Sequence, residues 1–220
     1  MVQVKICGNA TLDDARAAEA AGADLLGLII EVPVESPRKI PLDRARDIAR
    51  SLSKPAVAVL VDPTLDFALK AADATGAWAV QLSGNEPLDL ARKLTDQVRT
   101  IKAVHVQPDG RMRLPPGVAE PGSYLRGLED AADFLLLDSA APGKAGGTGL
   151  THNWSNARAT KELVGIPLIL AGGLTPDNVA RAVAEVDPWG VDVASGVEAA
   201  PGRKDPEKVK AFIQKAKGRP

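Results

Sequence analysis

The chain has 220 residues, of which 45% are hydrophobic, 25% charged and 3% aromatic. Its 27 Lys+Arg against 28 Asp+Glu give a formal net charge of −1, which excludes a broad basic surface for nucleic acid or an anionic membrane and leaves only a local patch open. No run of about 18 apolar residues occurs, so the sequence predicts no membrane span.

Sulfur and imidazole groups are scarce. The single cysteine, Cys7, cannot form an internal disulfide, and residues 1–10 lack the pattern of a secretory signal. We therefore expect the protein to be located in the cytoplasm, where thiols stay reduced. Two histidines and one cysteine also leave little for a zinc site, and we predict no bound metal.

Short runs rich in Val, Ile, Leu and Ala alternate with Ala-rich amphipathic segments of helical length. The short runs are nearly continuous in apolar character, as are strands of a parallel sheet that is buried on both faces. The predicted strands are 2–7, 24–30, 56–61, 78–82, 98–104, 133–137, 167–170 and 191–194. The clearest predicted helices are 12–21, 42–52, 65–74, 88–96, 178–185 and 206–216.

Eight strand signals that mostly alternate with helix signals predict an α/β chain folded as a (β/α)8 TIM barrel. A doubly wound open sheet is the alternative, but it typically has five or six strands. No linker is visible, so we expect residues 1–220 to form a single domain. The Pro-rich stretch 107–123 is either a lid or a surface loop leading to a short fifth helix, and a second long loop covers 139–153.

The loops after the last two predicted strands favour a phosphate site. In this barrel the active site lies at the carboxyl ends of the strands, and these two loops often hold a phosphate. Gly172-Gly173 and Ser195-Gly196 would let the backbone approach an anion and donate N–H groups at a helix start. A third patch, Gly146-Gly147, could complete this site. Tight turns would explain any one patch alone.

Cys7 and Asp138 are candidate proton carriers. They end the first and sixth predicted strands, which lie three steps apart around an eight-membered ring, so we expect them to face each other across the mouth. Lys5 lies on the same side of its strand as Cys7, and an inward ammonium there would favour the thiolate. Taken singly, a buried hydrophobic cysteine and a capping aspartate are at least as good an interpretation, but the joint placement of the two residues at strand ends favours function.

Arg38 and His105 are ambiguous from the residues alone. Arg38 could bind a carboxylate through two hydrogen bonds, or it could be a solvated charge beside Lys39. A lone histidine near a strand end is more often a hydrogen-bonded structural residue than a proton carrier.

These residues occur in motifs that resemble the phosphoribosylanthranilate isomerase family of tryptophan biosynthesis. The likeness runs nearly end to end through KICG, SPRKI, VQLSG, LLLDS, GGTG, AGGLTPDNV and GVDVASGVE. It implies the Amadori rearrangement of N-(5-phosphoribosyl)anthranilate to 1-(2-carboxyphenylamino)-1-deoxyribulose 5-phosphate, with Cys7 as general base and Asp138 as general acid. It also implies that Arg38 holds the anthranilate carboxylate and that the glycine loops hold the phosphate.

The implied chemistry needs no cofactor. A protonated Asp138 opens the ribose ring, and a Cys7 thiolate then removes the C2 proton, which calls for a raised carboxyl pKa and a lowered thiol pKa. We therefore expect the partner to be a small phosphorylated substrate, expect no binding of nucleic acid or membrane, and expect the protein to be a monomer or a homodimer.

The chain departs from the family pattern at a few positions. Ser83 replaces the histidine of QLHG, and Leu28 and the pair Leu60-Val61 stand where aromatic residues are common. We expect these changes to lie around the pocket for the anthranilate ring.

Two other readings stay open. Another phosphosugar barrel enzyme would need a Schiff-base lysine, for which Lys5 is the nearest candidate, or a metal site that two scattered histidines do not favour. The chain could also be a barrel that binds a phosphosugar without catalysis.

Overall fold

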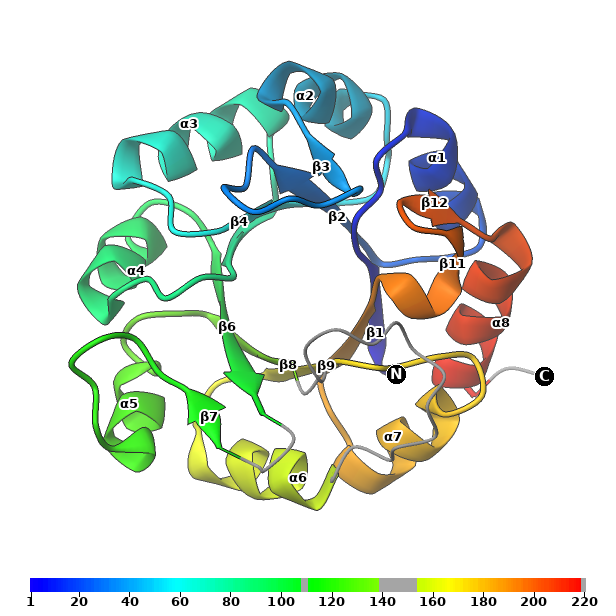
Figure 1. Ribbon diagram of the computed structural model, residues 1–220. Helices are drawn as coiled ribbons and strands as arrows, with labels where there is room; N and C mark the ends of the chain where they lie inside the picture. Colours follow the sequence, from blue (N-terminus) through cyan, green and yellow to red (C-terminus); the bar gives the residue numbers. More distant parts are fainter. Residues whose placement is uncertain (108–110, 139–153, 219–220) are drawn as a thin grey trace.

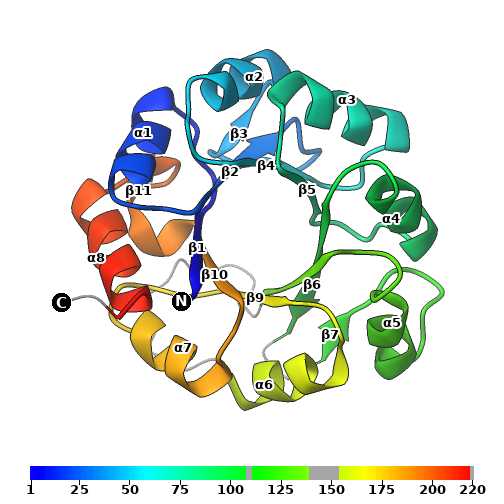
Figure 2. The ribbon, with the colours of Figure 1, turned by 180° about the vertical axis from the view of Figure 1, so that it is seen from behind.

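The computed structural model describes residues 1–107, 111–138 and 154–218. Among these residues, eight parallel strands close into a ring in the order β1, β10, β9, β8, β6, β5, β4, β2, and β2 pairs again with β1. Helices surround the ring on all sides (Figure 1), and the view from behind shows the same arrangement (Figure 2). The predicted TIM barrel is therefore confirmed.

The predicted elements are found within two residues of their expected ends. The ring strands are β1 (Gln3–Ile6), β2 (Leu25–Ile30), β4 (Ala56–Leu60), β5 (Ala79–Leu82), β6 (Thr100–Val106), β8 (Phe134–Asp138), β9 (Leu168–Ala171) and β10 (Gly190–Val193). The helices are α1 (Leu12–Ala20), α2 (Leu42–Arg50), α3 (Leu65–Thr75), α4 (Leu88–Thr95), α5 (Pro121–Gly127), α6 (Trp154–Leu163), α7 (Val179–Val186) and α8 (Pro206–Ala216).

Four short strands and one 3-10 turn decorate the barrel. β3 (Lys39–Ile40) extends the sheet beside β2, and β7 (Met112–Arg113) folds back antiparallel onto β6. The turn η1 (Ser195–Val197) follows β10 and leads into the antiparallel pair β11 (Glu198–Ala200) and β12 (Arg203–Lys204). β7 lies inside the stretch 107–123 that was expected to be a lid or a loop, and this stretch leads into the short fifth helix that we predicted.

Side chains alternate between the barrel interior and the layer of helices, as they must in a strand. Inward residues such as Val57, Ala103 and Leu136 form one buried cluster. At the amino-terminal ends of three strands, the rings of Trp78, Phe134 and Trp189 pack with centroids 4.5–6.4 Å apart. These rings fill that end of the barrel, which leaves the carboxyl ends to carry the polar groups.

Helix starts are fixed by local side chains. The Thr11 hydroxyl accepts a hydrogen bond from the Asp14 amide at the start of α1, and Thr64 does the same for Phe67 in α3.

Among the helices of the described ranges, none combines the length and the apolar character that a membrane span requires.

Candidate active site

The residues singled out in the sequence gather at the carboxyl ends of the barrel strands. Cys7 directly follows β1, and Asp138 is the last residue of β8, three strands away around the ring. Gly172-Gly173 follows β9, and Ser195-Gly196 begins η1 after β10. Gly146 and Gly147 lie outside the described residues.

Cys7 lies above a buried ion pair. The Lys5 Nζ atom is 3.0 Å from Asp192 Oδ1, and both residues point into the barrel, where Lys5 is 1% exposed. A Cβ atom on Gly27 would lie 2.8 Å from Cys7 Sγ and 2.9 Å from Lys5 Nζ, so the sulfur and the ammonium are close neighbours. Gly27 is therefore the residue that leaves room for the thiol above the ammonium.

The electrostatics of Cys7 correct one expectation. Burial raises the pKa of the thiol, and the nearby Lys5 ammonium lowers it by less, so the pKa is raised rather than lowered. Burial also opposes the charge on Lys5, but Asp192 and Cys7 outweigh it and raise the pKa of the ammonium. Lys5 therefore stays charged beneath a thiol that ionises with difficulty.

Asp138 contacts a histidine on the neighbouring strand. His105 on β6 pairs in register with Asp138 on β8, and His105 Nδ1 lies 3.4 Å from Asp138 Oδ2. The other ring nitrogen of His105, Nε2, lies 3.0 Å from the Ser83 carbonyl oxygen. The histidine is thus hydrogen-bonded to a backbone carbonyl, as expected of a structural residue, and it also contacts the predicted acid.

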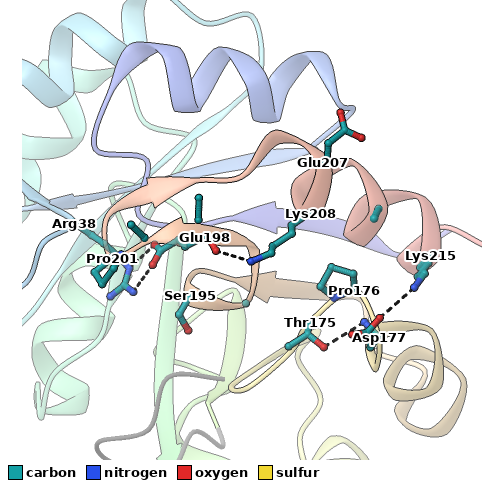
Figure 3. Close-up of a pocket in the computed structure, with 14 residues that line it drawn as sticks. Arg38, Thr175, Pro176, Asp177, Ser195, Glu198, Pro201, Glu207, Lys208 and Lys215 are labelled. Atoms are coloured by element: carbon teal, nitrogen blue, oxygen red, sulfur yellow. Dashed lines mark hydrogen bonds and ion pairs between the residues drawn. The ribbon is translucent and has the colours of Figure 1, made fainter. Parts of the chain in front are cut away.

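Arg38 is held by a carboxylate of the chain itself (Figure 3). Its Nε and Nη2 atoms each donate to a Glu198 carboxylate oxygen at 2.7 Å, and Glu198 also accepts from Lys204 Nζ at 3.1 Å. The arginine is therefore not a solvated charge beside Lys39. The Nε–Nη2 edge of its guanidinium is taken by Glu198, and the Nη1–Nη2 edge presents a second pair of donors.

The two predicted phosphate loops pack against each other. Gly172 and Gly173 have φ angles of +89° and +61°, a backbone conformation that residues with a Cβ atom rarely adopt. A Cβ atom on Gly196 would lie 1.9 Å from the Leu174 carbonyl oxygen, so only glycine fits there. Asn178 fixes the first loop, since its side chain accepts from the Thr175 amide and donates to the Gly173 carbonyl.

A groove of about 700 Å³ connects Arg38 with the loop after β10. Arg38, Ser195 and Gly196 all line it, together with residues of α8 (Figure 3). One continuous space therefore reaches both the arginine and one of the phosphate loops. Among the described residues, no group of three or more His, Cys, Asp or Glu side chains could hold a metal ion.

Two departures from the family pattern lie away from the site. Leu28 and Leu60 belong to the buried cluster that contains residues of α1 and α2, so they face the helices. For Leu28 and Leu60 the expectation that they line the ring pocket is therefore wrong, because the alternation of side chains along β2 and β4 turns these two residues outward.

Sequence reasoning missed three charged partners of the predicted residues, namely Asp192, Glu198 and Lys204. Asp192 and Lys204 are both buried, which requires an ionic or hydrogen-bonding partner. A charged residue inside the apolar strand GVDV, opposite an inward Lys5, was the available signal for Asp192. Nothing in the sequence pairs Arg38 with Glu198.

The family model of N-(5'-phosphoribosyl)anthranilate (PRA) isomerase matches residues 4–215. Curated N-(5'-phosphoribosyl)anthranilate isomerases are similar over nearly the whole chain. The protein of Geotalea uraniireducens is 43% identical, covering 99% of this chain and 100% of the relative. The protein of Haloferax volcanii is 41% identical, covering 99% and 94%.

Solved structures agree. Phosphoribosyl anthranilate isomerase from Thermotoga maritima is 37% identical with a TM-score of 0.85, covering 99% of this chain and 100% of that chain. A structure of the isomerase in complex with reduced 1-(o-carboxyphenylamino)-1-deoxyribulose 5-phosphate is 34% identical with a TM-score of 0.80 and the same coverage. With its motifs, its barrel and these relatives in agreement, the chain belongs to the phosphoribosylanthranilate isomerase family.

Proposed function

We propose that this barrel is the isomerase that converts N-(5-phosphoribosyl)anthranilate to 1-(2-carboxyphenylamino)-1-deoxyribulose 5-phosphate in tryptophan biosynthesis, with Cys7 and Asp138 as its proton carriers. The observation that carries the assignment is their placement at the ends of β1 and β8, three strands apart on one barrel mouth. Asp192 lies within electrostatic range of both residues, which supports a shared site.

Asp138 acts first, as general acid. Its proton goes to the ribose ring oxygen while the bond from that oxygen to C1 breaks, and the lone pair of the anthranilate nitrogen forms the C1=N double bond. The positive charge on nitrogen then acidifies the proton on C2. The Asp138 side chain is 29% exposed, which is consistent with access from the mouth.

Cys7 then acts as general base. Its thiolate removes the C2 proton, and the electron pair moves into a C1=C2 double bond to give an enolamine that tautomerises to the ketone. Because burial raises the thiol pKa, the thiolate is scarce at neutral pH but is a strong base once formed. The Lys5 ammonium at its side stabilises the negative charge.

The binding groups follow from the same geometry. The Nη1–Nη2 edge of Arg38 binds the anthranilate carboxylate while Glu198 holds the other edge. Gly172, Gly173, Ser195 and Gly196 bind the phosphate through backbone N–H groups, together with Gly146 and Gly147.

We further propose that residues 1–220 act as one domain, in the cytoplasm, as a monomer or a homodimer. A related isomerase from Thermotoga maritima is described as dimeric, with monomers generated from it. The partner is a small phosphorylated molecule, and no cofactor, nucleic acid or membrane takes part in the proposed reaction.

The structure disfavours a Schiff-base mechanism at Lys5. An attacking lysine must be neutral, whereas Asp192 keeps Lys5 charged and buried beneath Cys7. Growth rescue of a tryptophan auxotroph that lacks this isomerase tests the proposal, together with turnover by the purified protein. Binding of a sugar phosphate in calorimetry without turnover or rescue would instead support a non-catalytic barrel.

A further inference from the structure

His105 is placed between a carbonyl oxygen and the predicted acid. Its Nε2 atom is 3.0 Å from the Ser83 carbonyl oxygen, and its Nδ1 atom is 3.4 Å from Asp138 Oδ2. The imidazole is 37% exposed and belongs to β6, whose residues pair in register with β8 at this level. The ring is therefore fixed on one side and faces the site on the other.

The carbonyl partner decides which nitrogen carries the proton. A carbonyl oxygen only accepts hydrogen bonds, so Nε2 must be the protonated nitrogen. In a neutral ring, Nδ1 then carries a lone pair that points at the Asp138 carboxyl group. A lone pair and a carboxylate repel each other, so this contact is favourable only when one proton lies between Nδ1 and Oδ2.

The Asp138 carboxylate favours retention of that proton against the nearby cations. The described charged groups near His105 are Asp138 on β8, Lys102 on its own strand and Arg113, which pairs with it on β7. The hydrogen bond to Asp138 raises the pKa of His105, and together with the Ser83 carbonyl and the charge of Asp138 it outweighs burial and Lys102, which lower the pKa. Beyond Asp138, the Asp192 carboxylate adds a further negative charge.

We propose that His105 is a positioning residue that holds one shared proton on Asp138, ready for transfer to the ribose ring oxygen. The inference rests on the proposed isomerase function. In the transfer, the proton passes from the pair to the ring oxygen as the bond from that oxygen to C1 breaks. The pair is left as neutral histidine and carboxylate, and it regains one proton from solvent after the reaction.

The kinetic test compares His105→Gln with the wild type, because glutamine forms hydrogen bonds but holds no extra proton. At about pH 7.5 we expect kcat to fall roughly 10–100-fold, since an unassisted aspartate ionises near pH 4. The ratio of variant to wild-type kcat should rise toward acid pH, by up to about tenfold per pH unit. We use this ratio because Cys7 titrates in both enzymes, so its effect on kcat cancels.

A ratio that stays constant between about pH 5 and pH 8 would indicate a purely structural role and overturn the inference. Arg113→Gln is the matched control, because Arg113 is exposed to solvent and is not among the groups that shift the pKa of His105, so we expect it to leave the profile unchanged. A wild-type protein without turnover would refute the proposed function instead.

Histidine NMR tests the pair without any turnover. The chain has two histidines, so the signal lost in His105→Gln identifies His105. We expect an Nε2-protonated neutral ring and a pKa above the ordinary value of about 6.5, which Asp138→Asn returns toward that value. A His105 titration that Asp138→Asn does not change would contradict the shared proton.

Discussion

Arg38 and Glu198, which are 160 residues apart in the sequence, are joined by two hydrogen bonds of 2.7 Å. The contact ties the loop after β2 to the hairpin after β10. Glu198 is itself fixed, because Lys204 donates to its carboxylate and Lys208 donates to its backbone carbonyl. Arg38 is thus oriented by a buried carboxylate before any ligand binds.

Glu198→Gln tests this orientation in the enzymatic reaction. Loss of the charged acceptor should release Arg38 and raise KM about tenfold, with a smaller effect on kcat, because in the proposed mechanism the arginine binds substrate and moves no proton. Steady-state kinetics measure both constants. Glu207→Gln, an exposed change in the same groove, is the control. A Glu198→Gln enzyme with wild-type KM would show that Arg38 needs no such support.

The same carboxylate makes a pH-dependent contribution to stability. Burial raises the pKa of Glu198, but Arg38 and Lys204 outweigh it and lower the pKa overall. Its contribution to the free energy of unfolding is therefore complete at pH values above the ordinary glutamate pKa of about 4.3. The contribution is lost as the pH falls through the lowered pKa of the folded state. Glu198→Gln should lower the free energy of unfolding by roughly 2–4 kcal/mol at neutral pH.

Urea unfolding of wild type and Glu198→Gln, measured from neutral pH to about pH 3, follows this difference. We expect the gap between the two proteins to narrow only below about pH 4.3. A gap that is the same at every pH would mean that the charge of Glu198 contributes nothing.

Gly196→Ala tests the phosphate loops. The added Cβ would lie 1.9 Å from the Leu174 carbonyl oxygen, so η1 and the loop after β9 must separate. We expect inhibition by inorganic phosphate to weaken at least about tenfold, measured as the inhibition constant. Gly165→Ala, whose Cβ would be 3.4 Å from its nearest neighbour, should leave the constant unchanged. If phosphate inhibits Gly196→Ala as strongly as the wild type, the phosphate does not bind at these loops.

The ionisation of Cys7 can be followed directly, because it is the single cysteine. Burial raises the pKa of Tyr124, the single tyrosine, to about 12, so ultraviolet thiolate absorbance at lower pH reports Cys7 alone. We expect an inflection above the ordinary value of about 8.5 and a further rise in Lys5→Met, since the ammonium lowers the thiol pKa. An inflection below about 8.5 would contradict burial as the dominant effect.

The barrel could be predicted from the sequence because its signals are local. Strands such as Ala56–Leu60 are continuous apolar runs, and helices such as Leu42–Arg50 have an apolar face, so each segment specifies its own form. The short strand Met112–Arg113 lacks that pattern and exists only because β6 offers an edge. It could not be foreseen without the sheet.

The placement of Cys7 and Asp138 could be predicted because each stands at the end of a strand. The ionic partners were not, because Arg38–Glu198 and Lys5–Asp192 join residues that are distant in the chain and meet only when the ring closes. The thiol pKa was predicted in the wrong direction because the sequence shows the nearby charge but not the depth of burial.

The central claim is that Cys7 and Asp138 move the two protons of the isomerisation. Its most direct test is kcat for Cys7→Ser and for Asp138→Asn with phosphoribosylanthranilate, with product binding measured in parallel by calorimetry. We predict that each variant loses about 10²–10⁴-fold in kcat while it still binds the product. If either variant turns over substrate at the wild-type rate, that residue carries no proton and the assignment is wrong.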